Sequence, residues 1–283
     1  MLTIDVEDWF HLYGVGLQYQ FKKAKLDKRP WETFTGHMEA NTRWILDVLD
    51  EHKVTGTFFV LGWAAEKCPS LVKEIHKRGH EMGSHSYYHQ LIYNLSPDEF
   101  RNDLHRSVDI IQQLTGSKVY GFRASAASIT DWSIDIILQE GLIYDSSLYT
   151  VSYHDVYGKL TNVDKTKAIE QLKNGLWEVK FSSLKIGRLM IPWSGGGYFR
   201  LYPFPIYKMG VRNIIRKYGT YLLYVHPWEL DTNPIIDNNL KRIYRIRRYV
   251  NIRKTKQRFI KMLIDFKFIP IIQKLGEMNV KLT

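Results

Sequence analysis

The sequence predicts an α/β protein built around a mainly parallel β-sheet. Short apolar segments rich in β-branched and aromatic residues alternate with longer segments whose apolar residues recur at helical spacing, as in consecutive βα units. The 283 residues, of which 45% are hydrophobic, are enough to bury a substantial core. Polar residues suited to catalysis recur just after the expected strands, which is where α/β barrels carry their active sites.

The expected strands are short, apolar and buried. They are residues Leu2–Val6, Val54–Leu61, His80–Ser84, Lys118–Phe122, Leu142–Tyr144 and Tyr221–Val225. Histidine, arginine or aspartate follows most of them directly in the sequence. Because parallel strands present their carboxyl ends at one edge of the sheet, we expect these polar residues to lie together there.

Helices are expected at His37–Glu51, Ser70–Arg78, Ser96–Gly116 and Asp131–Glu140. The third has the clearest boundaries. Ser96-Pro97-Asp98-Glu99 combines an N-cap, a first-turn proline and a capping-box glutamate, and Gly116 is a typical C-terminal stop. Its expected core face is formed by Phe100, Leu104, Val108, Ile111 and Leu114.

We find no internal repeat, low-complexity linker or domain boundary, so we expect a single domain over residues 1–283. Thr150–Leu176 is polar and irregular, which predicts a long surface insertion. Residues from about 235 to 283 are expected to form a basic helical C-terminal segment of this domain.

Cys68 is the only cysteine, so no internal disulfide can form, and the chain fits a reducing compartment. It follows an apolar stretch that is typical of a helix end, and we expect a buried structural thiol. The chain opens on a strand pattern, without the apolar core of a signal peptide and without a membrane span. The expected location is the cytoplasm, with possible contact at the inner membrane face; a signal lost by truncation is the alternative.

The formal net charge is +11, and much of the excess lies in Lys241–Lys256. This segment has three possible roles: a solvated helical face, contact with an anionic membrane or glycan, or nucleic-acid binding. No nucleic-acid motif accompanies it, so no nucleic-acid partner is expected. The 14% of aromatic residues serve either core packing or the stacking of sugar rings.

His85 and His89 lie four residues apart after an expected strand, and Thr3-Ile4-Asp5-Val6-Glu7-Asp8 places three carboxylates at the end of another. Two imidazoles and one carboxylate can hold a divalent metal while leaving positions for water and substrate. A second carboxylate nearby could act as a general base. The plainer alternative is that both histidines are ordinary surface residues on one helical face.

The order of carboxylates, His-x-x-x-His, arginine and a strand-end histidine resembles the polysaccharide deacetylase family, also called carbohydrate esterase family four or the nodulation-factor-deacetylase-like domain. The sequences of three segments resemble those of a subgroup found with bacterial exopolysaccharide and exosortase systems. They are Asp5–His11, Gly195–Arg200 and His226–Asp231. The resemblance covers most of the chain and implies a distorted (β/α) barrel with fewer than eight units, with the active site at the C-terminal ends of the strands.

The resemblance also implies roles for individual residues. His85 and His89 would be metal ligands, Asp5 the general base and His226 the general acid. Arg123 would orient Asp5, and Asp145 would tune the acidity of His226. The usual third metal ligand is an aspartate adjacent to the base, but Val6 stands there. Glu7 and Asp8 both remain candidates for this ligand, and either could instead cap a turn.

Two further features concern the substrate. Gly195–Arg200 lacks the Lys-Ser/Thr of a phosphate loop and either lets the backbone approach a sugar or is a plain turn. We expect Tyr198, Arg200 and Trp228 to line the substrate cleft. Ser125 replaces the proline that the family usually has two residues after the arginine, so the shape of this loop is open.

The expected function is removal of N-acetyl groups from N-acetylhexosamine units of a bacterial surface polysaccharide or its precursor. The expected cofactor is one divalent metal, with Zn²⁺ first and Co²⁺ or Ni²⁺ as alternatives. Two rival hypotheses remain. One is hydrolysis of another small amide or an O-acetyl ester, and the other is a glycan-binding protein with a degraded active site.

Overall fold

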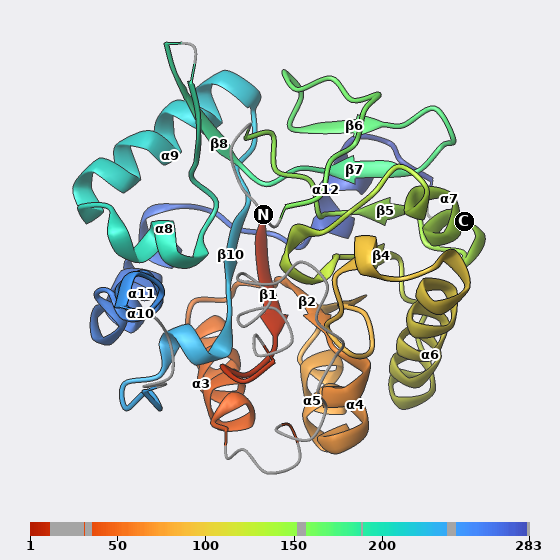
Figure 1. The fold of residues 1–283 in the computed structure, drawn as a ribbon. Helices are drawn as coiled ribbons and strands as arrows, with labels where there is room; N and C mark the ends of the chain where they lie inside the picture. Colours follow the sequence, from red (N-terminus) through yellow and green to blue (C-terminus); the bar gives the residue numbers. More distant parts are fainter. Residues whose placement is uncertain (12–30, 32–35, 152–156, 188, 237–241, 282–283) are drawn as a thin grey trace.

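The computed structural model describes residues 1–11, 31, 36–151, 157–187, 189–236 and 242–281 (Figure 1). Its main sheet has eight strands in the order β10-β1-β2-β3-β4-β5-β7-β6. All neighbouring pairs are parallel except β6 and β7. The sheet curls into an open half-barrel, which confirms the predicted distorted (β/α) barrel with fewer than eight units.

The strands are short and mostly buried. Their bounds are Leu2–Val6 for β1, Thr57–Val60 for β2, Glu81–Ser84 for β3, Gly121–Phe122 for β4, Tyr144–Asp145 for β5, Ile169–Gln171 for β6, Trp177–Val179 for β7 and Leu223–Val225 for β10. The first strand lies between β2 and β10, with Leu2 opposite Leu223. Strands from the two halves of the chain therefore pair within one sheet.

Side chains alternate along β1, and this alternation separates core from site. Leu2, Ile4 and Val6 belong to the large hydrophobic cluster shared with the helices. Asp5 points the other way and meets Arg123 inside the half-barrel. One five-residue strand thus contributes to the core and to the site.

The helices of the first half follow the strands along the sequence (Figure 1). They are α3 (Met38–Glu51), α4 (Gly62–Lys67), α5 (Pro69–Lys77), α6 (Pro97–Thr115) and α7 (Ser133–Gln139), with two 3-10 turns at Ile92–Asn94 and Ser125–Ala127. The expected capping box of α6 is present, because Ser96 and Glu99 bond each other's backbone N–H groups. Gly116 ends the helix in the left-handed conformation at φ 66°. Both termini therefore follow the sequence prediction.

The second half adds the edge strand β10, a hairpin and further helices (Figure 1). They are β8 (Ser183–Ile186), β9 (Leu189–Pro192), α8 (Gly196–Leu201), α9 (Phe204–Tyr218), the 3-10 turn Pro227–Leu230, α10 (Arg242–Tyr249), the 3-10 turn Ile252–Lys254, α11 (Thr255–Asp265) and α12 (Ile271–Glu277). Side chains from Leu2 to Phe268 share the largest core cluster.

Two expectations require correction. The stretch Thr150–Leu176 is not irregular throughout, because β6 lies in it and pairs antiparallel with β7; its residues 152–156 lie outside the described residues. Three residues are too few to give a recognisable strand period. Cys68 is half-buried rather than buried, because it lies at the junction of α4 and α5 beside Glu39. Among the described helices, none has the length and apolar character needed to span a bilayer.

Candidate active site

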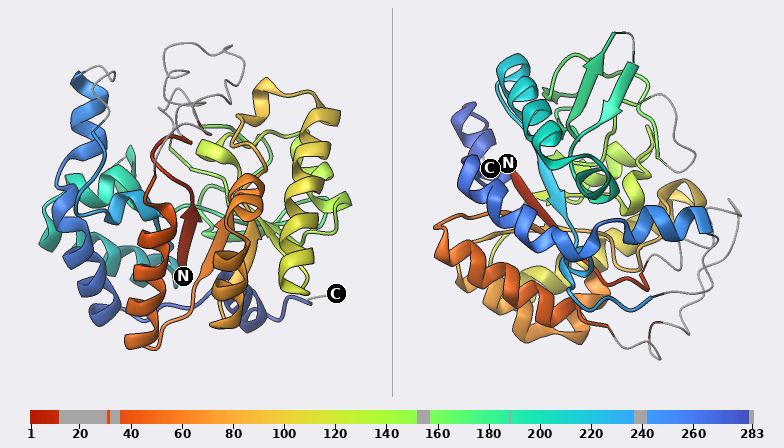
Figure 2. Two further views of the ribbon diagram at one scale, coloured as in Figure 1. Left: turned by 90° about the horizontal axis from the view of Figure 1, so that it is seen from below. Right: turned by 90° about the vertical axis from the view of Figure 1, so that its left-hand side faces the viewer.

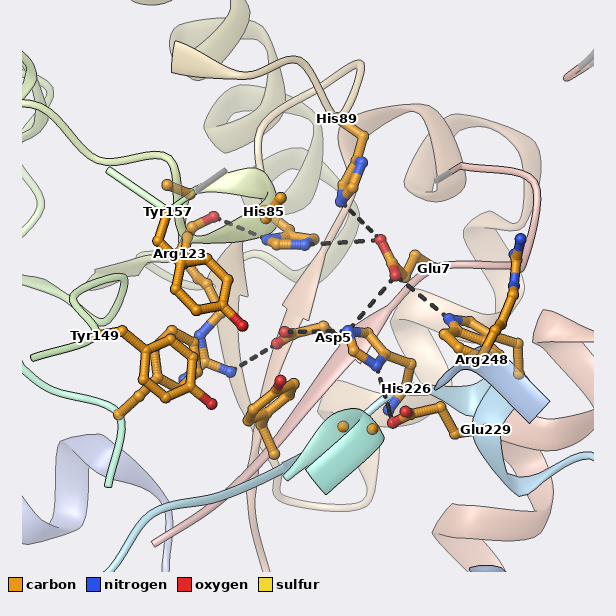
Figure 3. Close-up of a pocket in the computed structure, with 18 of the residues that line it drawn as sticks. Asp5, Glu7, His85, His89, Arg123, Tyr149, Tyr157, His226, Glu229 and Arg248 are labelled. Atoms are coloured by element: carbon orange, nitrogen blue, oxygen red, sulfur yellow. Dashed lines mark hydrogen bonds and ion pairs between the residues drawn. The ribbon is translucent and has the colours of Figure 1, made fainter. Parts of the chain in front are cut away.

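Three buried side chains converge at the carboxyl ends of β1 and β3. Glu7 follows β1 directly, and His85 follows β3. One carboxylate oxygen of Glu7, Oε2, lies 2.8 Å from Nε2 of His89 and 3.9 Å from Nε2 of His85 (Figure 3). One candidate ligand atom from each residue lies within 4.8 Å of the other two.

The backbone around the two histidines fixes where their rings point. The backbone N–H of His85 donates to the carbonyl of Val60, and its Nδ1 lies 2.8 Å from the carbonyl oxygen of Arg123. A carbonyl only accepts, so Nδ1 of His85 carries the proton and Nε2 faces Glu7 as an acceptor. His89 has a left-handed backbone with φ of 53°, a costly conformation that is concentrated at functional sites.

The electrostatics of the cluster favour neutral His85 and ionised Glu7. Burial lowers the pKa of His85 to about 4, although Asp5 and Glu7 oppose the shift. Burial alone would raise the pKa of Glu7, but the neighbouring His89, His226 and His85 hold it well below its ordinary range. An ionised carboxylate therefore faces an imidazole acceptor without a proton between them. A divalent cation fits this donor set, which is two imidazoles and a carboxylate.

Asp8, the other candidate for the metal ligand, is directed toward the start of α3 and not toward the two histidines. After Glu7 the chain turns, and the carboxylate of Asp8 accepts from the backbone N–H groups of Trp9 and Met38, both at 2.7 Å. Met38 is the first residue of α3, so Asp8 caps that helix. Gly36 permits this arrangement, because a Cβ atom there would lie only 1.9 Å from Oδ2 of Asp8.

Asp5 is held from behind by Arg123. The guanidinium donates to Oδ1 of Asp5 and to the hydroxyl of Thr3, both at 2.7 Å, and its remaining nitrogens donate to the carbonyl and hydroxyl of Ser146. Its carbon lies 4.7 Å from the ring centre of Phe181. Arg123 is 1% exposed, so this pairing fixes the orientation of Asp5. The other carboxylate oxygen, Oδ2, is directed toward His226.

His226 follows β10 and reaches the same cluster. Its Nε2 lies 3.5 Å from Oε1 of Glu7 and 3.8 Å from Oδ2 of Asp5. Its Nδ1 lies 2.9 Å from Oε2 of Glu229, which assigns the Nδ1 proton to that bond and turns Nε2 toward the pocket. Burial lowers the pKa of His226, and Glu7 and Asp5 counteract this. The ring of Trp228 stacks on the imidazole, with 5.6 Å between centres.

Asp145 does not have the role that was expected for it. It lies on β5, and its carboxylate accepts from the hydroxyl and the backbone N–H of Ser147 and shares a hydrogen bond with Glu178. Its described contacts do not include His226. The carboxylate that contacts His226 is Glu229, and an ion pair with Arg200 holds it in position. The sequence spacing could have predicted this contact, because Glu229 follows His226 by three residues, as in a capping box. The Glu229 carboxylate accepts from the backbone N–H of His226.

The three expected substrate residues have different positions. Trp228 and Arg200 line the pocket, but the guanidinium of Arg200 is buried against Glu229 and the carbonyl of Arg248. Tyr198 is not among the lining residues. Gly195, before Tyr198 in the sequence, packs directly against the backbone of Tyr224, because a Cβ on Gly195 would lie 1.9 Å from the carbonyl oxygen of Tyr224. Gly196 and Gly197 do border the pocket.

The pocket has a volume of about 180 Å³ and two unlike sides. Glu7, His85 and His89 lie on one side, and an aromatic wall that the sequence did not predict lies near Arg123 (Figure 3). The wall consists of Tyr149, Tyr157, Phe181 and Tyr224. Tyr149 stacks on Phe181 at 4.4 Å and on Tyr157 at 4.8 Å between ring centres. Ala126 and Ala127 also line the pocket.

Comparisons with known proteins agree with this fold and site. Residues 22–144 match the family model "Polysaccharide deacetylase", and residues 146–275 match a domain of unknown function, DUF3473. The first half of the chain thus resembles the polysaccharide deacetylase family. Asp5 and Glu7 precede both matched segments, whereas His226, Glu229 and the aromatic wall lie in the second. The segment of unknown function thus completes the pocket.

Two curated relatives are peptidoglycan deacetylases. One is a peptidoglycan-N-acetylglucosamine deacetylase of Bacillus cereus, 29% identical over 49% of this chain and 54% of its own length. The other is the peptidoglycan-N-acetylmuramic acid deacetylase PdaA of Bacillus subtilis, 33% identical over 32% of this chain and 35% of its own length. The chain thus spans about a third to a half of the length of these two relatives.

Solved structures share the fold. A putative polysaccharide deacetylase from Mycobacterium smegmatis has a TM-score of 0.55 at 18% identity, over 98% of this chain and 89% of its own. A CE4 family pseudoenzyme from Bacillus anthracis has a TM-score of 0.50 at 18% identity, over 96% of this chain and 63% of its own. At these identities the likeness concerns the fold alone.

Proposed function

We propose that this protein is a metal-dependent hydrolase that removes N-acetyl groups from N-acetylhexosamine units of a bacterial surface polysaccharide or its precursor. The observation that carries the proposal is the juxtaposition of Glu7, His85 and His89 with Asp5 and His226 at one edge of the sheet. The names of the relatives support an N-acetylated glycan as the substrate class.

Glu7, His85 and His89 would hold the cation, with Zn²⁺ as the first candidate and Co²⁺ or Ni²⁺ also compatible with the ligand set. A bound cation supplies Lewis acidity toward the acetyl carbonyl and increases the acidity of water in the pocket. The protein itself contributes burial and orientation. The bond from His85 to the Arg123 carbonyl fixes one imidazole, and the left-handed backbone at His89 fixes the position of the other.

Asp5 and His226 would share the proton transfers. The free oxygen of Asp5 accepts a proton from water as the water oxygen forms a bond to the acetyl carbon. Arg123 keeps that carboxylate in place during this step. The proton then passes from Oδ2 of Asp5 to Nε2 of His226, 3.8 Å away, and His226 donates it to the sugar nitrogen as the C–N bond breaks. Acetate and a free amino sugar are the products, and Glu229 stabilises the imidazolium through Nδ1.

The test is acetate release from a panel of N-acetylated and O-acetylated glycans, with and without a chelator. We expect release from N-acetylhexosamine polymers, loss with chelator and recovery when metal is restored. Release from O-acetyl esters alone would replace the amide assignment with an ester one. Glycan binding without any acetate release would identify a binding protein with an inactive site.

A further inference from the structure

Two long stretches of the second half lack acidic residues. Residues 179–228 contain no Asp or Glu and eight Lys or Arg, and residues 238–264 contain no Asp or Glu and ten Lys or Arg. The whole chain has 29 acidic residues among 283, so about five would be expected in the first stretch alone. The excess of basic over acidic residues is therefore concentrated in particular elements and is not spread over the chain.

The fold gathers these elements on one side. The hairpin β8–β9, α8, α9, α10 and α11 all lie on the left in Figure 1, and α9, α10 and α11 face the viewer in the right panel of Figure 2. The helix α9 packs against β8. Lys208 of α9 pairs with Asp265 at the end of α11 at 2.6 Å, which ties the two helices together.

This side exposes large aliphatic side chains as well as charge. Ile186 and Leu189 at the hairpin tip are 53% and 62% exposed, and Met209 of α9 and Ile264 of α11 are 64% and 65% exposed. Met209 and Ile264 adjoin the paired Lys208 and Asp265 in sequence. Leu201, Ile206, Ile215 and Ile246 are further exposed aliphatic residues of the same elements.

The same elements also carry exposed basic side chains. The exposed basic residues of these elements, and of the 3-10 turn between α10 and α11, are Lys185, Arg212, Arg216, Lys217, Arg242, Arg245, Arg253, Lys254 and Lys261. The segment Lys241–Lys256 singled out from the sequence is only partly available. Arg248 is buried and donates to the carbonyl of Trp9, and Nζ of Lys256 lies 4.1 Å from the ring centre of Trp44.

We propose that the face formed by the β8–β9 hairpin, α9, α10 and α11 docks on the surface of an anionic lipid bilayer. Basic side chains match anionic headgroups, and aliphatic side chains between them can enter the boundary with the acyl chains. A nucleic acid would use the charges but offers nothing to exposed isoleucine and leucine. The helix α10 links this face to the active site, because its Arg248 lines the pocket.

The test is co-sedimentation of the full chain with vesicles. The probes are neutral phosphatidylcholine vesicles and vesicles with added phosphatidylglycerol, over a salt series. The double variant Lys185→Glu and Arg216→Glu reverses two exposed charges on the face. Its matched control, Lys73→Glu and Lys77→Glu, makes the same change in net charge on the exposed side of α5. Met209→Ser, with Met278→Ser just after α12 as control, tests the aliphatic contribution.

We expect binding to anionic vesicles only, weakening with salt because charge interactions are screened. The face variant should lose at least about tenfold in partitioning, while the α5 variant stays close to wild type. Equal binding to both vesicle types, equal losses in both charge variants, or binding to a DNA duplex without binding to vesicles would overturn the proposal. Thermal melting shows that each variant is folded. No turnover is measured, so this result is independent of the proposed deacetylase activity.

Discussion

Glu7 lies where three imidazoles meet, and these neighbours rather than its burial determine its charge. Removing it from water favours the neutral acid, but His89, His226 and His85 favour the anion and hold its pKa low. The carboxylate of Asp8, the next residue, accepts from two backbone N–H groups and has no hydrogen bond to an imidazole among the described contacts. Adjacent carboxylates in the sequence thus belong to different parts of the molecule.

Replacing His85 or His89 with alanine should remove most of the bound metal, because two ligands are too few for a tight site. Asp8→Ala should keep the metal and lower stability by about 1 kcal/mol, because it removes the side-chain acceptor at the start of α3. Metal content by mass spectrometry and thermal melting measure the two effects. Full metal occupancy in the His85→Ala protein, or metal loss in the Asp8→Ala protein, would contradict this assignment.

Asp5→Asn should lower turnover by about 10²-fold or more while leaving the metal in place, since a general base typically contributes ~10²–10⁴-fold. The amide keeps the shape of the side chain and an oxygen that can accept from Arg123. The measurements are acetate release and metal content on the same preparation. Turnover within about threefold of wild type would rule out Asp5 as the base.

At the scale of elements, β5 and β7 place two carboxyl groups side by side behind Arg123. Burial raises the pKa of both Asp145 and Glu178, and their proximity raises that of Glu178 further. Asp145 accepts from the hydroxyl of Ser147, and that hydroxyl in turn accepts from the backbone N–H of Ala124. Through these hydrogen bonds, the Asp145–Glu178 pair helps to fix the backbone next to Arg123.

The stability of the Glu178→Gln protein, compared with that of wild type at the same pH, should increase as pH rises from about 4 toward 8. Both carboxyl groups have folded pKa values above their unfolded values of about 4, so the folded protein binds extra protons and loses stability as pH rises through that window. The neutral amide of the variant needs no proton and can donate to Asp145. Melting temperatures across this pH range measure the difference. Glu51→Gln, on the exposed end of α3, is the control and should show no such trend.

At the scale of the whole molecule, one sheet joins the two segments that match separate families. The strand β1 pairs with β10 on one side and β2 on the other, so the site cannot be completed by either half alone. The N-terminal amino group donates to the carbonyl of Tyr221, which adds a further link between the chain's first residue and its second half.

A fragment of residues 1–145 should therefore fail to form a cooperatively folded domain. It would lack β10 and β7, and it would expose the apolar surface that Leu2 and Ile4 bury. Circular dichroism with thermal melting, compared with the full chain, measures this. A sharp melting transition in the fragment would show that the first segment folds independently.

The sequence by itself determined the α/β class, the well-capped helix α6 and the convergence of strand-end residues, because these depend on local periodicity, caps and the geometry of parallel strands. It could not choose between Glu7 and Asp8, since that choice depends on a turn and on backbone donors of α3, about thirty residues away. It assigned Asp145 to His226, whereas the register of β5 and β7 pairs it with Glu178. The aromatic wall and the basic aliphatic face also required the tertiary structure, because their residues are far apart in the chain and come together only in the folded protein.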